Sequence, residues 1–96
     1  MYILRFLDSF KPTYIAIVKG DLEKERRTKK TLNFLRQEPF YPSLKSHKVN
    51  TRSFGERRSS WISGDLRIIW DFDPKEKMII TIFAIVTHTG AHREYK

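Results

Sequence analysis

Two segments near the end of this 96-residue chain carry its most reactive side chains. Asp65 and Arg67 lie in the first segment, and His88, His92 and Tyr95 lie at the end of the second. When RNA is cleaved by its own 2′-hydroxyl, a base takes that proton, cations stabilise the charge on the phosphate, and an acid protonates the leaving 5′-oxygen. Histidine and arginine can supply all three without a metal ion, so this set indicates metal-independent cleavage of RNA.

Each of these residues has a candidate role and a plainer interpretation. An arginine at position 67 offers a bidentate, permanently charged clamp for a phosphate, but with Asp65 it can also form an ordinary surface ion pair. His88 suits proton transfer because its unperturbed pKa is roughly 6.5, but a histidine at a strand end is often only a surface hydrogen-bonding group. Tyr95 can stack on a base or relay a proton.

Two further histidines extend the candidate catalytic set. His47 lies between Lys45 and Lys48, whose charges would lower its pKa and suit a base, although simple exposure to solvent is equally compatible with the sequence. His88 and His92 have the spacing of a helical zinc pair, but they lie in a glycine-containing segment that lacks further convincing ligands. We therefore expect no metal and no cofactor.

The charge balance points to a polyanionic partner. Nineteen Lys and Arg residues against eleven Asp and Glu residues give a formal charge of +8 and a pI near 10.0, which suits RNA, DNA, an acidic protein or an anionic membrane surface. The cationic run at residues 24–30 favours a solvated helix face. The candidate nucleic-acid contacts are Lys45, Lys48, Arg52, Arg57, Arg58, Trp61, Asp65 and Arg93.

A strand and two helices are expected in the first part of the chain. The apolar run at residues 2–7 predicts a strand, and Ser9 is expected to cap a helix that ends at Gly20. Asp21 is expected to cap a second helix that runs to about Arg36. The apolar stripe of the second helix is expected to contain Leu22, Leu32 and Leu35.

Three consecutive strands are expected in the second part. Residues 44–49 predict a short strand, residues 50–60 a basic hairpin loop, residues 61–72 a strand with one wet face, and residues 78–86 a central strand. In the third of these segments the alternation directs one set of side chains to the core: Ile62, Leu66, Ile68, Trp70 and Phe72. The opposite parity directs Ser63, Asp65, Arg67 and Asp71 to solvent, and Trp61 away from Trp70.

These elements predict an α+β fold with a single domain over residues 1–96. The expected order is an N-terminal strand, two helices, and an antiparallel three-strand meander, with the helices packed on one sheet face and the other face open. The apolar run from Met78 to Val86 is too short to span a membrane, which takes about 20 residues. The first residues are charged too early for a signal peptide, and the chain has no cysteine, so cytoplasm is the expected location.

Three segments in order resemble a known superfamily. They are Glu38-Pro-Phe-Tyr-Pro-Ser-Leu-Lys-Ser-His-Lys-Val49, Gly64-Asp-Leu-Arg-Ile-Ile-Trp70 and Val86-Thr-His-Thr-Gly-Ala-His-Arg-Glu-Tyr-Lys96. Together they are similar to the RelE/ParE superfamily of bacterial toxin-antitoxin toxins, and most of all to its RelE-like and YafQ-like branch. The resemblance implies a RelE-like fold and a metal-independent endoribonuclease that cuts mRNA, commonly in the ribosomal decoding site. It implies catalytic roles for Arg67, His88 and Tyr95 more directly than for His47 or His92.

The same resemblance implies partners and leaves two alternatives. The implied partners are mRNA, the ribosome and a cognate antitoxin, with which a toxin-antitoxin hetero-oligomer would form, and no membrane is implied. One alternative is a ParE-like protein that poisons DNA gyrase without catalysis, although three histidines argue against it. The other is an attenuated member that only binds nucleic acid.

Overall fold

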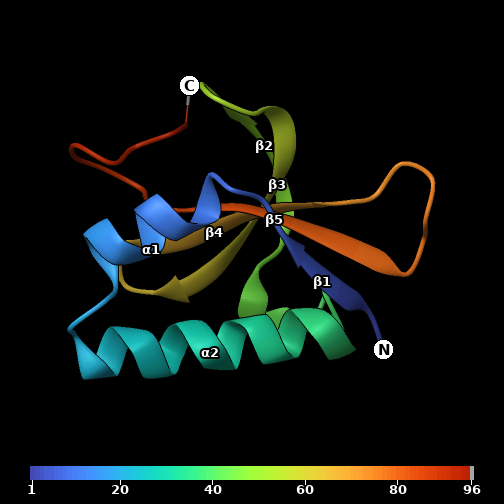
Figure 1. Ribbon diagram of the computed structural model, residues 1–96, viewed down its shortest axis with the longest axis horizontal. Helices are drawn as coiled ribbons and strands as arrows, with labels where there is room; N and C mark the ends of the chain where they lie inside the picture. The colour runs from blue at the N-terminus through green and yellow to red at the C-terminus, as the bar shows by residue number, and fades with distance from the viewer. Residues whose placement is uncertain (96) are drawn as a thin grey trace.

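The computed structural model describes residues 1–95 and contains two helices and a five-stranded sheet (Figure 1). The elements in chain order are β1 (Ile3–Phe6), α1 (Phe10–Ile17), α2 (Leu22–Gln37), the short 3₁₀ turn η1 (Pro42–Leu44), β2 (His47–Thr51), β3 (Gly55–Ser63), β4 (Leu66–Phe72) and β5 (Ile79–Thr87). The strand order is β1-β5-β4-β3-β2, in which β1 is parallel to β5 and the other neighbours are antiparallel. The predicted α+β class is confirmed, but the meander has four strands instead of three.

A missed hairpin accounts for the extra strand. The predicted single strand over residues 61–72 is wrong, because the chain reverses at Gly64 and Asp65 to form β3 and β4. Gly64 has a φ of +44°, a left-handed conformation that favours glycine. After the turn Arg67 pairs directly with Trp61, so both side chains lie on the same sheet face. The predicted division of side chains between two faces is still confirmed, because the apolar residues predicted for the core in residues 61–72 do lie on the helix side of the sheet.

The segment before the hairpin also differs from expectation. Leu44 is not in a strand but in η1, because Pro42 opens a 3₁₀ turn that Lys45, with a φ of +50°, ends in a left-handed conformation. The strand then begins at His47. The predicted basic loop over residues 50–60 is wrong as well: only residues 52–54 form the turn, and Arg57 and Arg58 belong to β3.

Helix α2 begins as predicted, and its predicted apolar stripe is confirmed in part, since Leu35 is fully buried and Leu32 packs against the core. The Asp21 carboxylate accepts a hydrogen bond of 3.1 Å from the backbone N–H of Lys24. Leu22 is wrong as a core residue, since it is 83% exposed. The buried positions are Thr28, Thr31 and Leu35, whose spacing of three and four residues places them on one helix face, away from Leu22.

Helix α1 completes the edge of β5 that β1 leaves unpaired. β1 pairs with β5 only as far as Ile82. Beyond that point the Ser9 hydroxyl donates to the Phe83 carbonyl at 2.7 Å, and the Thr13 hydroxyl accepts from the Ile85 N–H at 2.9 Å. Ser9 was expected to cap the helix, but it makes no capping hydrogen bond because its hydroxyl is used on the strand. The Phe83 carbonyl and the Ile85 N–H at this edge are thereby satisfied by side chains.

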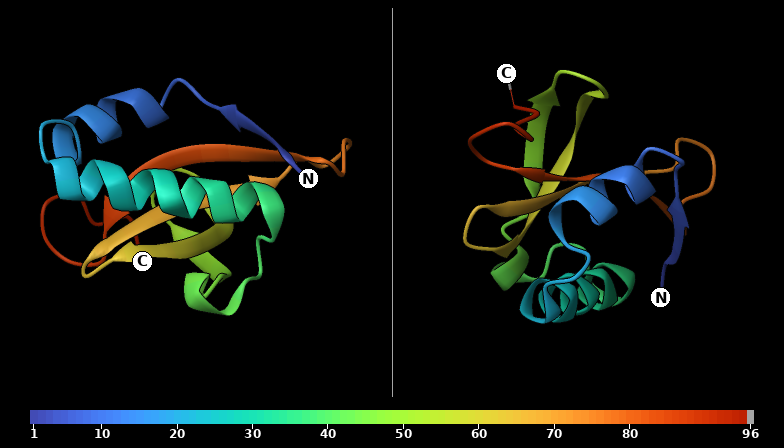
Figure 2. Two further views of the ribbon diagram at one scale, coloured as in Figure 1. Left: turned by 90° about the horizontal axis from the view of Figure 1, so that it is seen from below. Right: turned by 60° about the vertical axis from the view of Figure 1, so that its left-hand side comes forward.

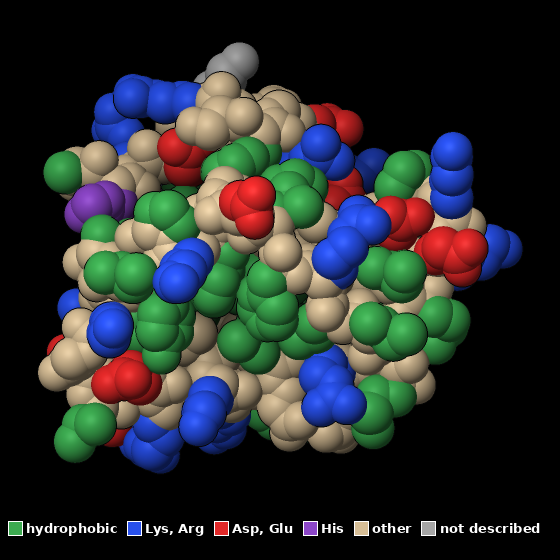
Figure 3. Space-filling model, in the orientation of Figure 1, with side chains coloured by type: hydrophobic (Ala, Val, Ile, Leu, Met, Phe, Trp, Pro, Cys, Tyr) green, Lys and Arg blue, Asp and Glu red, His purple; other side chains and the backbone are tan. Residues whose placement is uncertain are grey.

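The sheet separates two apolar clusters. Both helices lie on one side of it (Figures 1 and 2), over a core that includes Val18, Leu35, Trp70 and Ile82. Hydrophobic side chains also show between α1 and α2 on the surface of this side (Figure 3). No helix within residues 1–95 is long and apolar enough to cross a membrane.

The sequence predicts that the opposite face of the sheet is open, and this prediction is wrong. It holds a second cluster formed by Ile69, Phe83, Ala84 and Val86. A register shift in the β4–β5 ladder lets Trp70 pair with Ile82 while Ile69 pairs with Ala84, which places Phe83 and Ala84 together on this side. The segment after β5 returns across the end of the sheet toward β2 (Figure 2), and its Tyr95 covers part of this cluster.

Candidate functional site

Seven side chains border one hollow of about 300 Å³, hereafter the Arg67 hollow. They come from the link between η1 and β2, from β2, β3 and β4, and from the segment after β5: Lys45, His47, Val49, Trp61, Arg67, His88 and Tyr95. All but Val49 were candidate residues on sequence grounds. The fold therefore brings together residues that are up to fifty positions apart in sequence.

The carbonyl of Gly64 orients two side chains of the hollow. Arg67 Nη1 donates to Gly64 O at 2.7 Å and to Leu66 O at 3.0 Å, and Trp61 Nε1 donates to Gly64 O at 3.2 Å. The expected ion pair with Asp65 is not formed, and Asp65 instead accepts a hydrogen bond from the Thr89 hydroxyl at 3.2 Å. Within residues 1–95 no carboxylate lies within ion-pair distance of Arg67. The guanidinium is thus held in place by two backbone carbonyls, and its positive charge is not neutralised by a carboxylate of the described residues.

His47 has a defined tautomer when it is neutral. Its Nδ1 lies 2.8 Å from the Lys45 carbonyl oxygen, and because a carbonyl can only accept, Nδ1 carries the proton. The lone pair is then on Nε2, the atom that a general base uses. The ammonium group of Lys45 lies 5.6 Å from the centre of the Trp61 ring and adds positive charge to the same side.

Tyr95 holds its proton at neutral pH. Burial raises the pKa of Tyr95, an effect that the hydrogen bond to Ser59 and the charge of Arg67 oppose and that Asp65 reinforces. Its hydroxyl lies 2.6 Å from the hydroxyl of the fully buried Ser59. The ring centres of Tyr95 and His88 are 5.2 Å apart, so the tyrosine supports the imidazole from one side.

The segment that carries Tyr95 is tied to the turn between β2 and β3. The Glu94 carboxylate accepts hydrogen bonds from the N–H and the hydroxyl of Ser53 at 2.8 and 2.9 Å. The Glu94 carbonyl accepts from the Arg52 N–H at 2.8 Å, and Tyr95 forms a β-bridge with Thr51. Sequence reasoning missed these contacts and the role of Ser59, because such polar residues occur throughout the chain.

His92, Arg93 and Arg52 are among the candidate residues that do not border the Arg67 hollow. His92 borders two other cavities, next to Ile17 of α1 and Ser9 before it. Arg93 is exposed and forms a β-bridge with Thr87, and Arg52 is exposed in the β2–β3 turn. His92 is separated from His88 by a bend at Gly90, which has a φ of +85°. Within residues 1–95 no three His, Asp or Glu side chains are grouped so as to hold a metal ion.

Arg57 and Arg58 are engaged in the packing of the sheet. Both lie near the Asp71 carboxylate, with N–O distances of 3.4 and 3.6 Å. The Arg57 guanidinium lies 4.5 Å from the centre of the Phe83 ring on one face, and that of Arg58 lies 5.5 Å from the centre of the Phe40 ring on the other. With Lys48 they border a separate small cavity away from the Arg67 hollow.

Comparison with known proteins gives fold-level matches alone. No protein-family model and no curated protein sequence matches the chain. Among solved structures it resembles a chain of the archaeal RelE–RelB complex from Pyrococcus horikoshii, with a TM-score of 0.68 and 18% identity over 94% of this chain and 98% of that one.

Two bacterial toxins give similar values. A copper-bound mutant toxin from Helicobacter pylori matches with a TM-score of 0.66 and 17% identity over 92% of this chain and 96% of that one. YafQ from E. coli matches with a TM-score of 0.67 and 13% identity over 91% and 93%. The similarity extends over nearly the whole of each chain, and we conclude that this protein has the RelE-like toxin fold.

Proposed function

We propose that this protein is the toxin of a toxin-antitoxin pair and that it is a metal-independent endoribonuclease acting on mRNA, in the cytoplasm and on the ribosome. The observation that carries the proposal is the convergence of Arg67, His47, His88 and Tyr95 on one hollow. The fold that it shares with RelE and YafQ toxins supports it. Residues 1–96 would act as one domain.

The geometry supports one assignment of roles. His47 Nε2 takes the proton of the 2′-hydroxyl, and the 2′-oxygen attacks the adjacent phosphorus atom. The bond from phosphorus to the 5′-oxygen breaks, and His88, in its protonated form, donates a proton to that oxygen. The products are a 2′,3′-cyclic phosphate and a 5′-hydroxyl. Arg67 stabilises the negative charge that develops on the phosphate, and Tyr95 holds the imidazole of His88 in position.

Neighbouring residues would bind the rest of the RNA. Lys45 and Trp61 border the Arg67 hollow and can contact the phosphate and base of a flanking nucleotide. Lys48, Arg52 and Arg93 are exposed and add long-range attraction, whereas Arg57, Arg58 and Asp65 already have partners within the protein.

An acidic antitoxin is the proposed protein partner. The formal charge of +8 favours an acidic segment that folds as it binds, and one similar structure is a complex of RelE with RelB. Toxin and antitoxin would form a hetero-oligomer.

The test is cleavage of synthetic single-stranded RNA and of mRNA on translating ribosomes. Substituting His47, His88 or Arg67 by alanine should each lower the cleavage rate by about 10² to 10⁴. His92→Ala is the matched control, since that histidine lies outside the hollow, and should cut at the normal rate.

Two results would each reject one part of the proposal. Undiminished cleavage by the Arg67→Ala, His88→Ala double variant would reject the residue assignment. Inhibition of DNA supercoiling by gyrase with all RNA intact would reject the nuclease and favour a gyrase poison.

A further inference from the structure

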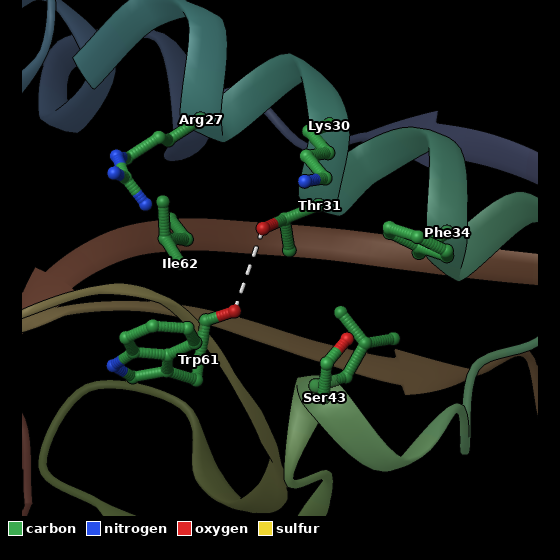
Figure 4. Close-up of a pocket in the computed structure, with 8 residues that line it drawn as sticks. Arg27, Lys30, Thr31, Phe34, Ser43, Trp61 and Ile62 are labelled. Atoms are coloured by element: carbon green, nitrogen blue, oxygen red, sulfur yellow. Dashed lines mark hydrogen bonds between the residues drawn. The ribbon is translucent and has the colours of Figure 1, made fainter. Parts of the chain in front are cut away.

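A second cavity adjoins the Arg67 hollow and shares its Trp61 wall. This α2 groove, of about 110 Å³, lies between α2 on one side and η1 and β3 on the other (Figure 4). Its lining residues are Arg27, Lys30, Thr31, Phe34, Ser43, Leu44, Trp61 and Ile62. Trp61 lines both cavities and so connects them.

The groove has an apolar floor and aromatic walls. Thr31, Leu44 and Ile62 are buried beneath it. The Thr31 hydroxyl donates to the Trp61 carbonyl at 3.4 Å, which joins α2 to β3 at this point (Figure 4). Phe34 is fixed by stacking on Tyr41, with ring centres 4.7 Å apart. The walls are therefore held in place by contacts of their own.

The rim of the groove is cationic. Arg27 and Lys30 extend from α2 toward the side of Ile62 and Trp61 (Figure 4). Glu23 accepts hydrogen bonds from both Arg26 and Arg27, so one carboxylate is shared by two guanidinium groups and leaves a net positive charge. Within residues 1–95 Lys30 makes no ion pair. Lys and Arg side chains also gather along α2 on the molecular surface (Figure 3).

The size and chemistry of the groove favour a ligand that packs along it over one enclosed within it. Sites for small-molecule ligands usually measure about 300–1,000 Å³, so this groove is too small to enclose one. Aromatic walls with a cationic rim suit a single-stranded nucleic acid, whose bases stack while its phosphates pair with lysine and arginine. Continuity with the Arg67 hollow favours RNA over an acidic peptide.

We infer that the α2 groove is a second nucleotide subsite for single-stranded RNA, adjacent to the site of cleavage. Lys30 and Arg27 bind the phosphate of the nucleotide next to the scissile one, and its base packs against Trp61. The inference rests on the proposed function, since it is the Arg67 hollow that defines the scissile position. The sequence suggests that the cationic run at residues 24–30 of α2 is only a solvated helix face. In this inference two of its residues bind RNA.

The test measures binding of a fully 2′-O-methylated RNA strand, which cannot be cleaved, to the full-length protein by fluorescence anisotropy. Lys30→Glu should weaken binding several-fold more than Lys29→Glu, the matched control, which makes the same charge change at the neighbouring exposed position outside the groove. Lys30→Glu should also lower the salt dependence of log K by roughly 0.7 to 1. A methylated dinucleotide, which fills only the Arg67 hollow, should bind both variants alike.

The possible results separate the two proposals. Equal binding of the long strand by both variants, or no binding by the unchanged protein, overturns the subsite. A Lys30 effect that is seen with an acidic peptide and not with RNA also overturns it. If the Lys30 effect on RNA is present but natural RNA is left uncut, the α2 groove stands as an RNA-binding site and the nuclease function fails.

Discussion

Tyr95 and Ser59 form the most enclosed polar contact of the candidate site. The serine is fully buried and the tyrosine is half-buried, and their hydroxyl oxygens are 2.6 Å apart. Because the pKa of Tyr95 is raised by burial, the folded protein binds the phenolic proton more tightly than the unfolded chain does. Ionisation of this group therefore favours unfolding.

The stability of the protein should fall in alkali through Tyr95. Below the ordinary tyrosine pKa, about 10, Tyr95 causes no change in the free energy of unfolding with pH. As the pH rises from there through the raised pKa of Tyr95, the free energy of unfolding falls. Tyr95→Phe should lose about 0.5–1.5 kcal/mol at neutral pH, from the hydrogen bond to Ser59, but should show a shallower alkaline decline. Urea unfolding at a series of pH values measures both effects.

Tyr41→Phe, the same change at a more exposed tyrosine, is the control for the substitution itself. An equal decline in Tyr95→Phe and the unchanged protein would contradict the assignment to Tyr95.

At this scale the sequence identifies reactive side chains but not their neighbours. Arg67, His88 and Tyr95 stand out by residue type, and the fold places all three in one hollow. Val49 and Ser59 do not stand out, because a valine or serine in a strand has no distinctive pattern. His92 is close to His88 in sequence, but the bend at Gly90 directs it elsewhere, and that direction depends on tertiary contacts.

Among the elements, the β3–β4 turn determines the geometry of the Arg67 hollow most directly. The carbonyl of Gly64 accepts hydrogen bonds from both Trp61 and Arg67, on opposite sides of the hairpin. The orientation of this carbonyl depends on a left-handed backbone that L-residues other than Gly, Asn and Asp seldom adopt. A change of turn conformation would move both side chains at once.

Gly64→Ala should therefore affect stability and cleavage together. We expect a loss of about 1–2 kcal/mol in the free energy of unfolding, the usual cost of a left-handed residue with a side chain, and a drop in RNA cleavage greater than this loss explains. Chemical unfolding and cleavage rates measured at a temperature where both proteins are folded test this.

Gly20→Ala provides the comparison, since Gly20 also has a positive φ, of 94°, but lies between the helices. It should lose stability and keep its cleavage rate. A Gly64→Ala protein with normal cleavage would show that the turn does not position the hollow.

The missed hairpin has a simple cause. Alternation of apolar residues continues through residues 61–72 almost without interruption, so periodicity alone indicates one strand. The pair Gly64-Asp65 is a sequence signal for a two-residue turn, and the structure shows that this signal outweighs the periodicity.

For the molecule as a whole, net charge dominates the proposed encounter with RNA. The formal charge of +8 attracts a polyanion from a distance, and the cations of the Arg67 hollow and the α2 groove lie on neighbouring parts of the surface. Binding of RNA should then release counterions from the strand.

The affinity for a methylated RNA strand should fall steeply with salt. Log K against log salt concentration should be linear, with a slope of roughly −0.7 for each phosphate contacted. An uncharged-backbone analogue of the same base sequence should bind weakly and with little salt dependence. A salt-independent affinity for RNA would show that stacking, not charge, accounts for binding.

The sequence predicts the class of the fold better than its connections. The α+β class and the helix-side core, including Trp70 and Ile82, follow from local patterns of apolar residues. The parallel pairing of β1 with β5 does not, because no local signal specifies which distant strand a short apolar run will join. The covered second face depends on the register shift near Trp70, which is also a tertiary feature.

The parallel pairing of β1 with β5 also determines when the sheet can be completed during synthesis. Arg5 and Thr81 are partners in the ladder and are 76 positions apart, so β1 waits for β5 before it can join the sheet. During synthesis on a ribosome, β1 and both helices emerge before β2, β3, β4 and β5. His88 and Tyr95 emerge later still. A nascent chain therefore has no assembled Arg67 hollow, and the ribosome that produces the protein is exposed to a finished site only after residue 95 has left it.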